Sequence, residues 1–370
     1  MRTRHGLAYV FFTAMLLSPS SRAQSAALTI QSNLVLVPAM VKTHAGERVY
    51  LLTAEDFSLT DNGLQQTVHL EEDADREPLA LAVIVQTGGH AAVHLKDYQH
   101  LEPILEALIG GVPHTIAVIG FDSKPVLAQD FTGSSKDAAE SIANLESSGD
   151  GVAILDAIEF GIGRLKAVPP RYRRTILLLS ETFDKSSESS LDQAVRAIGD
   201  TNTTIYSLAF SSARAEIAHH AGKIPVPGGT AYSYTPYAPG GCMSRAPGAD
   251  PDAHGNRGIQ AWDCAADLLP PLRIAELALV AAKVDLRRNV PEAVARLTGG
   301  EYFNFKDAKS LDAHLVGLMN DVPNHYVLSF RPTSPTPGPH ALRLEVAAQP
   351  ELIVEARSAY WMEDQTPQAK

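Results

Sequence analysis

The chain has 370 residues, of which 45% are hydrophobic and 20% are charged, and its formal net charge is −11. These values are ordinary for a globular protein and exclude wholesale disorder, a collagen-like repeat and a coiled coil. The acidic balance, without any basic block, argues against nucleic acid or an anionic membrane surface as the main partner. The length predicts one large domain or two to three medium ones.

The first 23 residues have the pattern of a secretory signal peptide. Arg2, Arg4 and His5 precede a short apolar run, and Ser21-Arg22-Ala23 places small residues at the −3 and −1 positions. Cleavage is expected after Ala23, which predicts a periplasmic or secreted mature protein. The apolar run is too short to span a bilayer, so no stable membrane insertion is expected after signal removal. The alternative is a short buried helix at the terminus.

Residues 24–77 are expected to form a small antiparallel β unit. An apolar, strand-like run occupies 33–43, and a short capped helical turn is expected at 53–56. Asn62-Gly63 then separates the strands FSLTD (57–61) and LQQTVHLEE (64–72). Asn-Gly is a strong hairpin signal because both central residues of a type I′ turn need positive φ.

Residues 78–322 alternate between buried strands and amphipathic helices. The four main apolar runs are LALAVIV (79–85), HTIAVIGF (114–121), TILLLS (175–180) and TTIYSLAF (203–210), with a shorter partner strand PVLAQDFT (125–132). Continuous apolar runs indicate strands buried on both faces. Their alternation with helices predicts a doubly wound, mostly parallel sheet in an α/β domain.

An insertion at about 222–271 interrupts this pattern. It is rich in Gly and Pro and is expected to be a long loop rather than part of the sheet. Cys242 and Cys264 both lie in it and are expected to form a disulfide in an exported protein, with two free thiols as the alternative. Aromatic residues often anchor interfaces, so four of them form a candidate interaction surface, unless they pack the insertion onto its own domain. These residues are Tyr232, Tyr234, Tyr237 and Trp262.

Helical patterns resume at Arg273, and a last strand and a helix capped by Ser310 end the α/β domain. The segment 323–362 is β again, with strands HYVLSF (325–330), HALRLEVA (340–347) and LIVEARSAY (352–360), and 363–370 is a tail. The N-terminal and C-terminal β segments are each too small to hold a core alone. They are therefore expected to pack together as one antiparallel sandwich beside the α/β domain.

Three loops are expected at the carboxyl ends of the parallel strands, where ligands bind in sheets of this type. They are residues 86–90, 150–153 and 181–184. The sequence contains no GxxxxGKS/T, HExxH or GxSxG motif, so a phosphate-binding loop, a zinc-protease helix and a nucleophile elbow are not indicated.

Several segments, taken in order, resemble one family. GVAILDAI (151–158) is similar to a helix start that usually reads GTALYDAI, and LLLSETFD (177–184) is similar to a strand and loop that usually end in Ser-Asp-Gly. Residues 34–66, 289–303 and 325–360 add to the match. Together they resemble the VWFA-related acidobacterial family of exported bacterial proteins, over most of the mature chain. The resemblance implies a von Willebrand factor A-type (VWA) domain.

The resemblance also implies the position of a metal-ion-dependent adhesion site. The two Asp positions of that site are held by Gln86 and Glu181, its two Ser positions by Gly88 and His90, and its Thr position by Val152. Mg²⁺ requires oxygen ligands in octahedral geometry, whereas an imidazole suits softer metals. Only one carboxylate and one amide oxygen are left, so the site is expected to be degenerate, without Mg²⁺ or another cofactor.

The sequence leaves three hypotheses for function open. The first is an exported, non-enzymatic protein that binds a protein or glycan partner without a metal. The second is cation-dependent adhesion with substituted ligands, in which Asp150 or Asp184 rescues metal binding. The third is a hydrolase that uses His90, Glu181 and Asp184.

Overall fold

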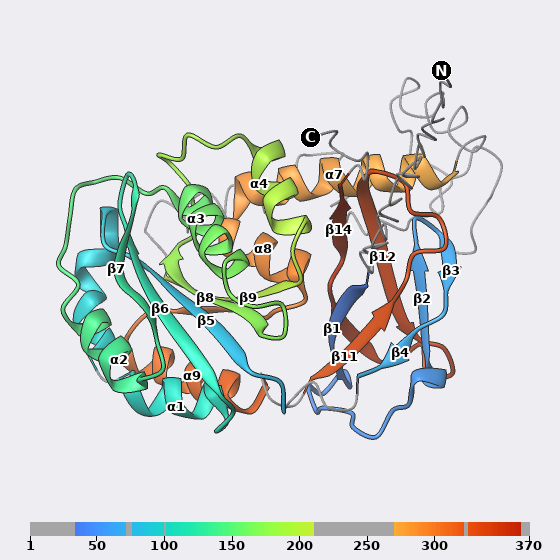
Figure 1. Ribbon diagram of the computed structural model, residues 1–370, viewed down its shortest axis with the longest axis horizontal. Helices are drawn as coiled ribbons and strands as arrows, with labels where there is room; N and C mark the ends of the chain where they lie inside the picture. Colours follow the sequence, from blue (N-terminus) through green and yellow to red (C-terminus); the bar gives the residue numbers. More distant parts are fainter. Residues whose placement is uncertain (1–33, 72–75, 100, 211–269, 322–324, 364–370) are drawn as a thin grey trace, which may run out of the picture. The chain divides into compact units, whose positions relative to one another are not determined.

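The structure is a computed structural model that describes residues 34–71, 76–99, 101–210, 270–321 and 325–363 (Figure 1). The predicted signal segment, both cysteines and the four aromatic residues of the insertion lie outside these ranges. The expectations for these residues therefore stay predictions.

A six-stranded sheet forms the centre of the α/β part, in the order β10-β9-β8-β5-β6-β7. All neighbours are parallel except β6 and β7, which are antiparallel. This confirms the doubly wound, mostly parallel sheet that the sequence predicted. The strands are β5 (Leu79–Gln86), β6 (His114–Phe121), β7 (Pro125–Thr132), β8 (Arg173–Glu181), β9 (Thr203–Phe210) and β10 (Tyr302–Phe305).

Helices cover both faces of this sheet, as Figure 1 shows. One face packs on α1 (Glu102–Ile109), α2 (Ser135–Ala143) and α9 (Ala308–Asp321). The other face packs on α3 (Ile154–Lys166), α4 (Leu191–Gly199), α7 (Pro270–Arg288) and α8 (Val290–Thr298). Every residue of β5 is buried, because side chains of alternate residues enter the two helical layers.

Two helix starts differ from the prediction. Helix α7 begins at Pro270, before the expected Arg273, because Pro is well suited to the first turn of a helix. Helix α9 is capped by Asp307 and not by Ser310: Asp307 Oδ1 accepts the Ser310 amide at 2.8 Å. The carboxylate occupies the position where an acidic side chain satisfies a free amide of the first turn.

The second part is a sandwich of two antiparallel sheets, in the orders β13-β1-β11-β4 and β14-β12-β2-β3. Each sheet contains strands from both ends of the chain, as predicted. Its core includes Val37, Leu59, Leu328 and Phe330, which are fully buried. The strands are β1 (Val35–Lys42), β2 (Phe57–Asp61), β3 (Leu64–Gln66), β4 (His69–Leu70), β11 (Tyr326–Phe330), β12 (Gly338–Val346), β13 (Ile353–Ala356) and β14 (Ala359–Met362).

The predicted hairpin at Asn62-Gly63 is present, with φ of 48° and 80° at its two residues. Two other strand predictions are wrong. Residues 64–72 form β3 and β4, and residues 352–360 form β13 and β14, with each pair divided between the two sheets. At the second crossing, Val354 and Ala356 before it and Tyr360 and Met362 after it all pack on the sandwich core, so the sequence pattern has the appearance of one continuous strand.

Candidate functional site

The predicted loops meet at the carboxyl edge of the central sheet. Gln86 is the last residue of β5 and Glu181 is the last residue of β8, and these two strands are parallel neighbours. Both side chains are 0% exposed. Two polar side chains buried this completely need hydrogen-bond partners.

Gln86 and Glu181 are hydrogen-bond partners of each other. Gln86 Oε1 accepts the backbone amide of Glu181 at 2.7 Å, and Gln86 Nε2 donates to Glu181 Oε1 at 2.8 Å. The same nitrogen donates to the Gly88 carbonyl at 2.9 Å. The amide of Gln86 thus ties the first loop to the third, and its oxygen is already used by the backbone.

The second carboxylate oxygen of Glu181 contacts a lysine. Lys185 Nζ lies 2.6 Å from Glu181 Oε2, and the Lys185 side chain is 34% exposed. His90 Nδ1 lies farther from the same oxygen, at 3.7 Å, on a largely exposed side chain. A buried carboxylate needs a charge partner and hydrogen bonds, and here the protein supplies both.

Glycines close the loops over this pair. A Cβ atom on Gly88 would lie 2.3 Å from the Gly151 carbonyl oxygen and 2.7 Å from Asp122 Cβ. Gly89 has a φ of +60°, and a Cβ there would lie 2.7 Å from Glu181 Oε1 and 2.9 Å from Val152 Cγ2. The five sequence-predicted positions therefore gather at one place, but the loop backbone fills the space that a serine side chain at Gly88 would need.

Val152 contributes its backbone and not a ligand. Its side chain is buried, and its carbonyl accepts the amides of Lys185 at 2.9 Å and of Ser186 at 3.1 Å. Ser186 Oγ in turn accepts the Val152 amide at 3.0 Å. These bonds hold the second and third loops together without any added group.

The two further carboxylates that the sequence suggested are placed differently. Asp184 caps helix α3, because its Oδ2 accepts the Leu155 amide at 2.9 Å and the Ser187 hydroxyl at 2.6 Å. Asp150 is exposed. Within the described ranges, no group of three His, Cys, Asp or Glu side chains is arranged to hold a metal.

Two further residues at this edge, Lys185 and Asp122, are not predicted by the sequence. Lys185 follows Glu181 by four positions. In a helix this spacing would predict an ion pair, but in an irregular loop it predicts no contact. Asp122 follows directly after β6, one position beyond Phe121, which pairs with Gln86. Partial burial acts to raise the pKa of Asp122, but hydrogen bonds from the Lys124 amide and from Ser123 lower it below its usual value, which keeps Asp122 a carboxylate.

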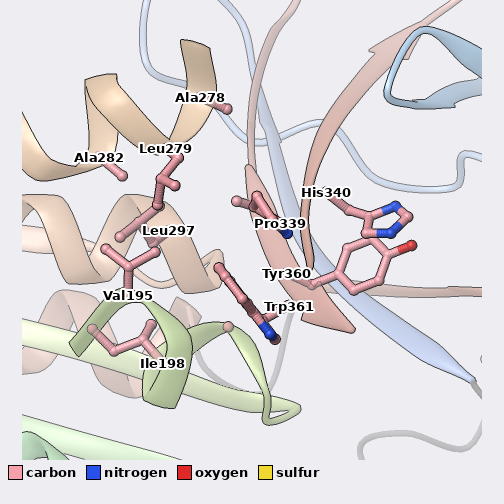
Figure 2. Close-up of a pocket in the computed structure, with 12 residues that line it drawn as sticks. Val195, Ile198, Ala278, Leu279, Ala282, Leu297, Pro339, His340, Tyr360 and Trp361 are labelled. Atoms are coloured by element: carbon pink, nitrogen blue, oxygen red, sulfur yellow. The ribbon is translucent and has the colours of Figure 1, made fainter. Parts of the chain in front are cut away.

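The described residues also enclose a small cavity away from this edge, beside α4, α7, α8, β12 and β14 (Figure 2). Its volume is about 20 Å³, and its walls are mostly apolar, with Val195, Leu279, Leu297 and Trp361 among them. Such a volume holds about one water molecule, so this cavity is a packing gap and not a substrate site. No described helix is both long enough and apolar enough to cross a membrane.

No protein-family model and no curated protein matches the chain significantly. Several solved structures are similar in fold. The conserved hypothetical protein BatB from Bacteroides thetaiotaomicron has 11% identity and a TM-score of 0.37, over 66% of this chain and 98% of that one. The SpRpn10 VWA domain has 12% identity and a TM-score of 0.30, over 36% and 76%.

A von Willebrand factor type A structure from Catenulispora acidiphila has 14% identity and a TM-score of 0.31, over 49% of this chain and 42% of that one. Because all these identities are low and all three TM-scores are below 0.5, we take no function from these proteins. The contacts within this chain are the stronger guide to its function.

Proposed function

We propose that this chain is an exported, non-enzymatic, VWA-like protein that binds a protein or glycan partner without a metal ion. One observation carries the metal-independent part of the proposal. The only acidic side chain at the predicted metal position, Glu181, has one oxygen on Gln86 and the other on Lys185. An ammonium group at 2.6 Å already supplies the positive charge that a divalent cation would bring.

The neighbouring positions support the same proposal. Gly88 has no side chain, and the loop backbone leaves no space for one. Val152 is apolar, and His90 offers a nitrogen, which Mg²⁺ binds poorly. Removing the water shell of Mg²⁺ is costly, and a single neutralised carboxylate cannot offset it.

The contacts also favour a non-enzymatic role over the hydrolase alternative. Both oxygens of Glu181 and both oxygens of Asp184 accept hydrogen bonds from the protein. His90 Nδ1 is 3.7 Å from Glu181 Oε2, too far for a hydrogen bond that would orient its ring, and a general base needs such a geometry before its pKa matters. A hydrolase built from these three side chains would need the loops to rearrange.

Export and the location of the partner surface rest on sequence alone. The signal pattern of residues 1–23 supports export. The insertion aromatics support a partner surface of protein or glycan type, since rings of this kind anchor interfaces. These residues are Tyr232, Tyr234, Tyr237 and Trp262.

The test is affinity capture from the native envelope with residues 24–370 as bait, in buffer with Mg²⁺ and in buffer with EDTA. We expect the same partner under both conditions, and we expect a variant with all three tyrosines changed to serine to lose it. A partner that is lost in EDTA and returns with Mg²⁺ would favour cation-dependent adhesion. If the tyrosine variant captures the partner as well as the wild type does, the three tyrosines are not part of the binding surface.

A further inference from the structure

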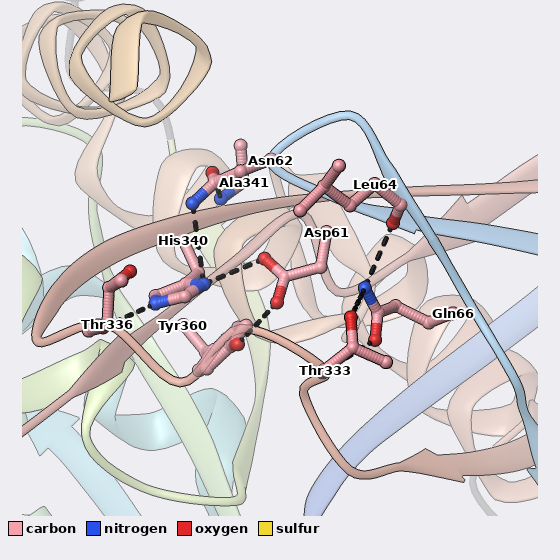
Figure 3. Close-up of polar contacts among 9 residues, drawn as sticks. All are labelled: Asp61, Asn62, Leu64, Gln66, Thr333, Thr336, His340, Ala341 and Tyr360. Atoms are coloured by element: carbon pink, nitrogen blue, oxygen red, sulfur yellow. Dashed lines mark hydrogen bonds and ion pairs between the residues drawn. The ribbon is translucent and has the colours of Figure 1, made fainter. Parts of the chain in front are cut away.

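A buried ionisable cluster joins strands β2, β12 and β14 of the sandwich (Figure 3). His340 on β12 is 2% exposed, and Asp61 at the end of β2 and Tyr360 on β14 are also buried. Nothing in the proposed partner binding uses these side chains. Buried titratable groups are costly, so a cluster of three requires an explanation.

The hydrogen bonds fix the charge of the histidine. His340 Nδ1 lies 2.8 Å from Asp61 Oδ1, and His340 Nε2 lies 2.7 Å from the Thr336 carbonyl oxygen. A carboxylate and a carbonyl only accept hydrogen bonds, so both ring nitrogens must carry a proton. Asn62 Nδ2 is 3.4 Å from Nδ1, but both nitrogens then carry hydrogen, so this contact is not a hydrogen bond. The ring is thus an imidazolium.

The surroundings support this charge state. Tyr360 donates its hydroxyl to the other oxygen of Asp61 at 2.8 Å, and its ring stacks on His340 with the centroids 4.6 Å apart. Arg357 is close enough to Tyr360 to influence its titration. The walls that α4, α7 and α8 add on the cavity side are apolar (Figure 2). Among the described residues, Asp61 and Tyr360 are therefore the titratable groups that face His340.

His340 also holds a loop. The connection 331–337 between β11 and β12 is attached to the sandwich at two points. At one point, the Thr333 amide donates to Gln66 Oε1, and Gln66 Nε2 donates to Thr333 Oγ1, both at 3.1 Å. At the other, His340 Nε2 donates to Thr336. Only the second attachment depends on a proton that can be lost near neutral pH.

We propose that His340 is a cationic latch that holds the connection 331–337 against the sandwich and releases it as the pH rises. A neutral imidazole has a single N–H. It can donate either to the buried Asp61 carboxylate or to the Thr336 carbonyl, so its deprotonation breaks one of these two hydrogen bonds.

The direction of the pH dependence follows from the same contacts. Burial acts to lower the pKa of His340, but the hydrogen bonds and negative charge of Asp61 and the Thr336 carbonyl outweigh it and raise the pKa above its usual value. A raised pKa means that the latch stabilises the fold fully below about pH 6.5, the ordinary value for an unfolded chain. This stabilisation is lost as the pH rises through the raised pKa.

The first test is a ¹⁵N NMR titration of the full chain labelled at histidine, with His340 assigned by its loss in His340→Gln. We expect both ring nitrogens to be protonated at pH 6 and a titration midpoint above about 6.5. A midpoint at or below that value, or a single protonated nitrogen at pH 6, would overturn the proposal. If His340→Gln folds poorly, the His340 signal is assigned by substituting the other histidines one at a time. The protonation state and the titration midpoint are then read from the wild-type spectrum.

The second test is hydrogen exchange of residues 331–341 at pH 6 and pH 9, corrected for intrinsic rates. We expect protection in the wild type to fall about tenfold or more between these values. His340→Gln should show weak protection at both. Thr333→Val removes the hydroxyl bond of the neutral attachment and keeps its amide bond, so it should show weaker protection overall but the same pH step. If protection in His340→Gln falls as much between pH 6 and pH 9 as in the wild type, the pH dependence comes from another group and the proposal is wrong.

Discussion

At the scale of single residues, the buried carboxylate of Glu181 depends on Lys185. We expect Lys185→Met to lower the free energy of unfolding by about 2 kcal/mol or more, because it leaves a buried charge without a partner. The double variant Glu181→Gln/Lys185→Met should recover most of this loss, since the glutamine needs no counter-charge. Urea unfolding of the two single variants and the double variant measures the coupling. If the double variant is no more stable than Lys185→Met, the stability of the buried Glu181 carboxylate does not depend on Lys185.

Leu51 is a second residue with a testable cost. Its side chain is 96% exposed, and its φ is +67°, a left-handed conformation that is unfavourable for a leucine. Tyr326 holds the chain on both sides of Leu51, because the Tyr326 hydroxyl donates to the Val49 carbonyl at 3.0 Å and accepts the Leu52 amide at 3.1 Å.

We therefore expect Leu51→Asn to raise the free energy of unfolding by about 1 kcal/mol, since asparagine tolerates this conformation better. Leu51→Ala is the matched control, because it removes the apolar side chain but keeps a Cβ atom in the strained conformation. Equal stability of both variants in urea unfolding would mean that the loop relaxes and stores no strain.

The sequence predicts the site residues that end adjacent strands, but not the side chains that reach them from a loop or from a distant strand. Gln86 and Glu181 were placed together because adjacent parallel strands end at one edge. Lys185 was missed because the path of an irregular loop decides whether its ammonium group reaches Glu181. His340 was missed because its partners, Asp61 and Thr336, lie on a distant strand and in a loop.

At the scale of elements, the break between β13 and β14 is one place where the sandwich is fixed to the α/β part. Arg357 lies in this break and is buried. Its Nη2 donates to the carbonyls of Gly199 at 3.0 Å and Thr201 at 2.8 Å, and its Nη1 donates to Asn202 Oδ1 at 3.0 Å. Burial without a carboxylate partner lowers the pKa of this guanidinium to about 10. The group also caps the carbonyl end of helix α4.

We expect Arg357→Met to lower the free energy of unfolding by about 3 kcal/mol or more, because it leaves several buried carbonyls without donors. Arg357→Lys should recover part of the loss, since one ammonium replaces only some of these bonds. Hydrogen exchange should locate the loss of protection at residues 199–202 and 357–360 in both variants. A loss of protection spread evenly over the chain would contradict this assignment.

Elements buried on both faces were the easiest to predict. The strands β5, β6 and β8 each contain an unbroken apolar run, and β9 contains one that only Ser207 interrupts, unlike the amphipathic helices between them. The sequence does not predict the crossings at residues 67–68 and 357–358. At 357–358, apolar core residues stand on both sides while the hydrogen-bond partners change sheet. Periodicity indicates which side of a strand is buried, but not which neighbour it pairs with.

At the scale of the whole molecule, the two ends of the chain depend on each other. β1 pairs with β11 on one side and β13 on the other, so its strand neighbours both come from the C-terminal segment. We expect deletion of residues 325–370 to remove hydrogen-exchange protection from 35–42 and 57–61, while β5 and β8 keep part of theirs. Unchanged protection of the N-terminal strands after the deletion would contradict the shared sandwich.

Partner binding without a metal requires that the protein's own groups close the carboxyl edge of the sheet and that this edge binds no divalent cation. Isothermal titration calorimetry with millimolar Mg²⁺ and Mn²⁺ measures this on the wild type, on Glu181→Ala and on Glu188→Ala, a control at an exposed carboxylate of the same loop. We predict no saturable heat in any of the three proteins. A saturable heat in the wild type and in Glu188→Ala that disappears in Glu181→Ala would show instead that the edge is a working metal site.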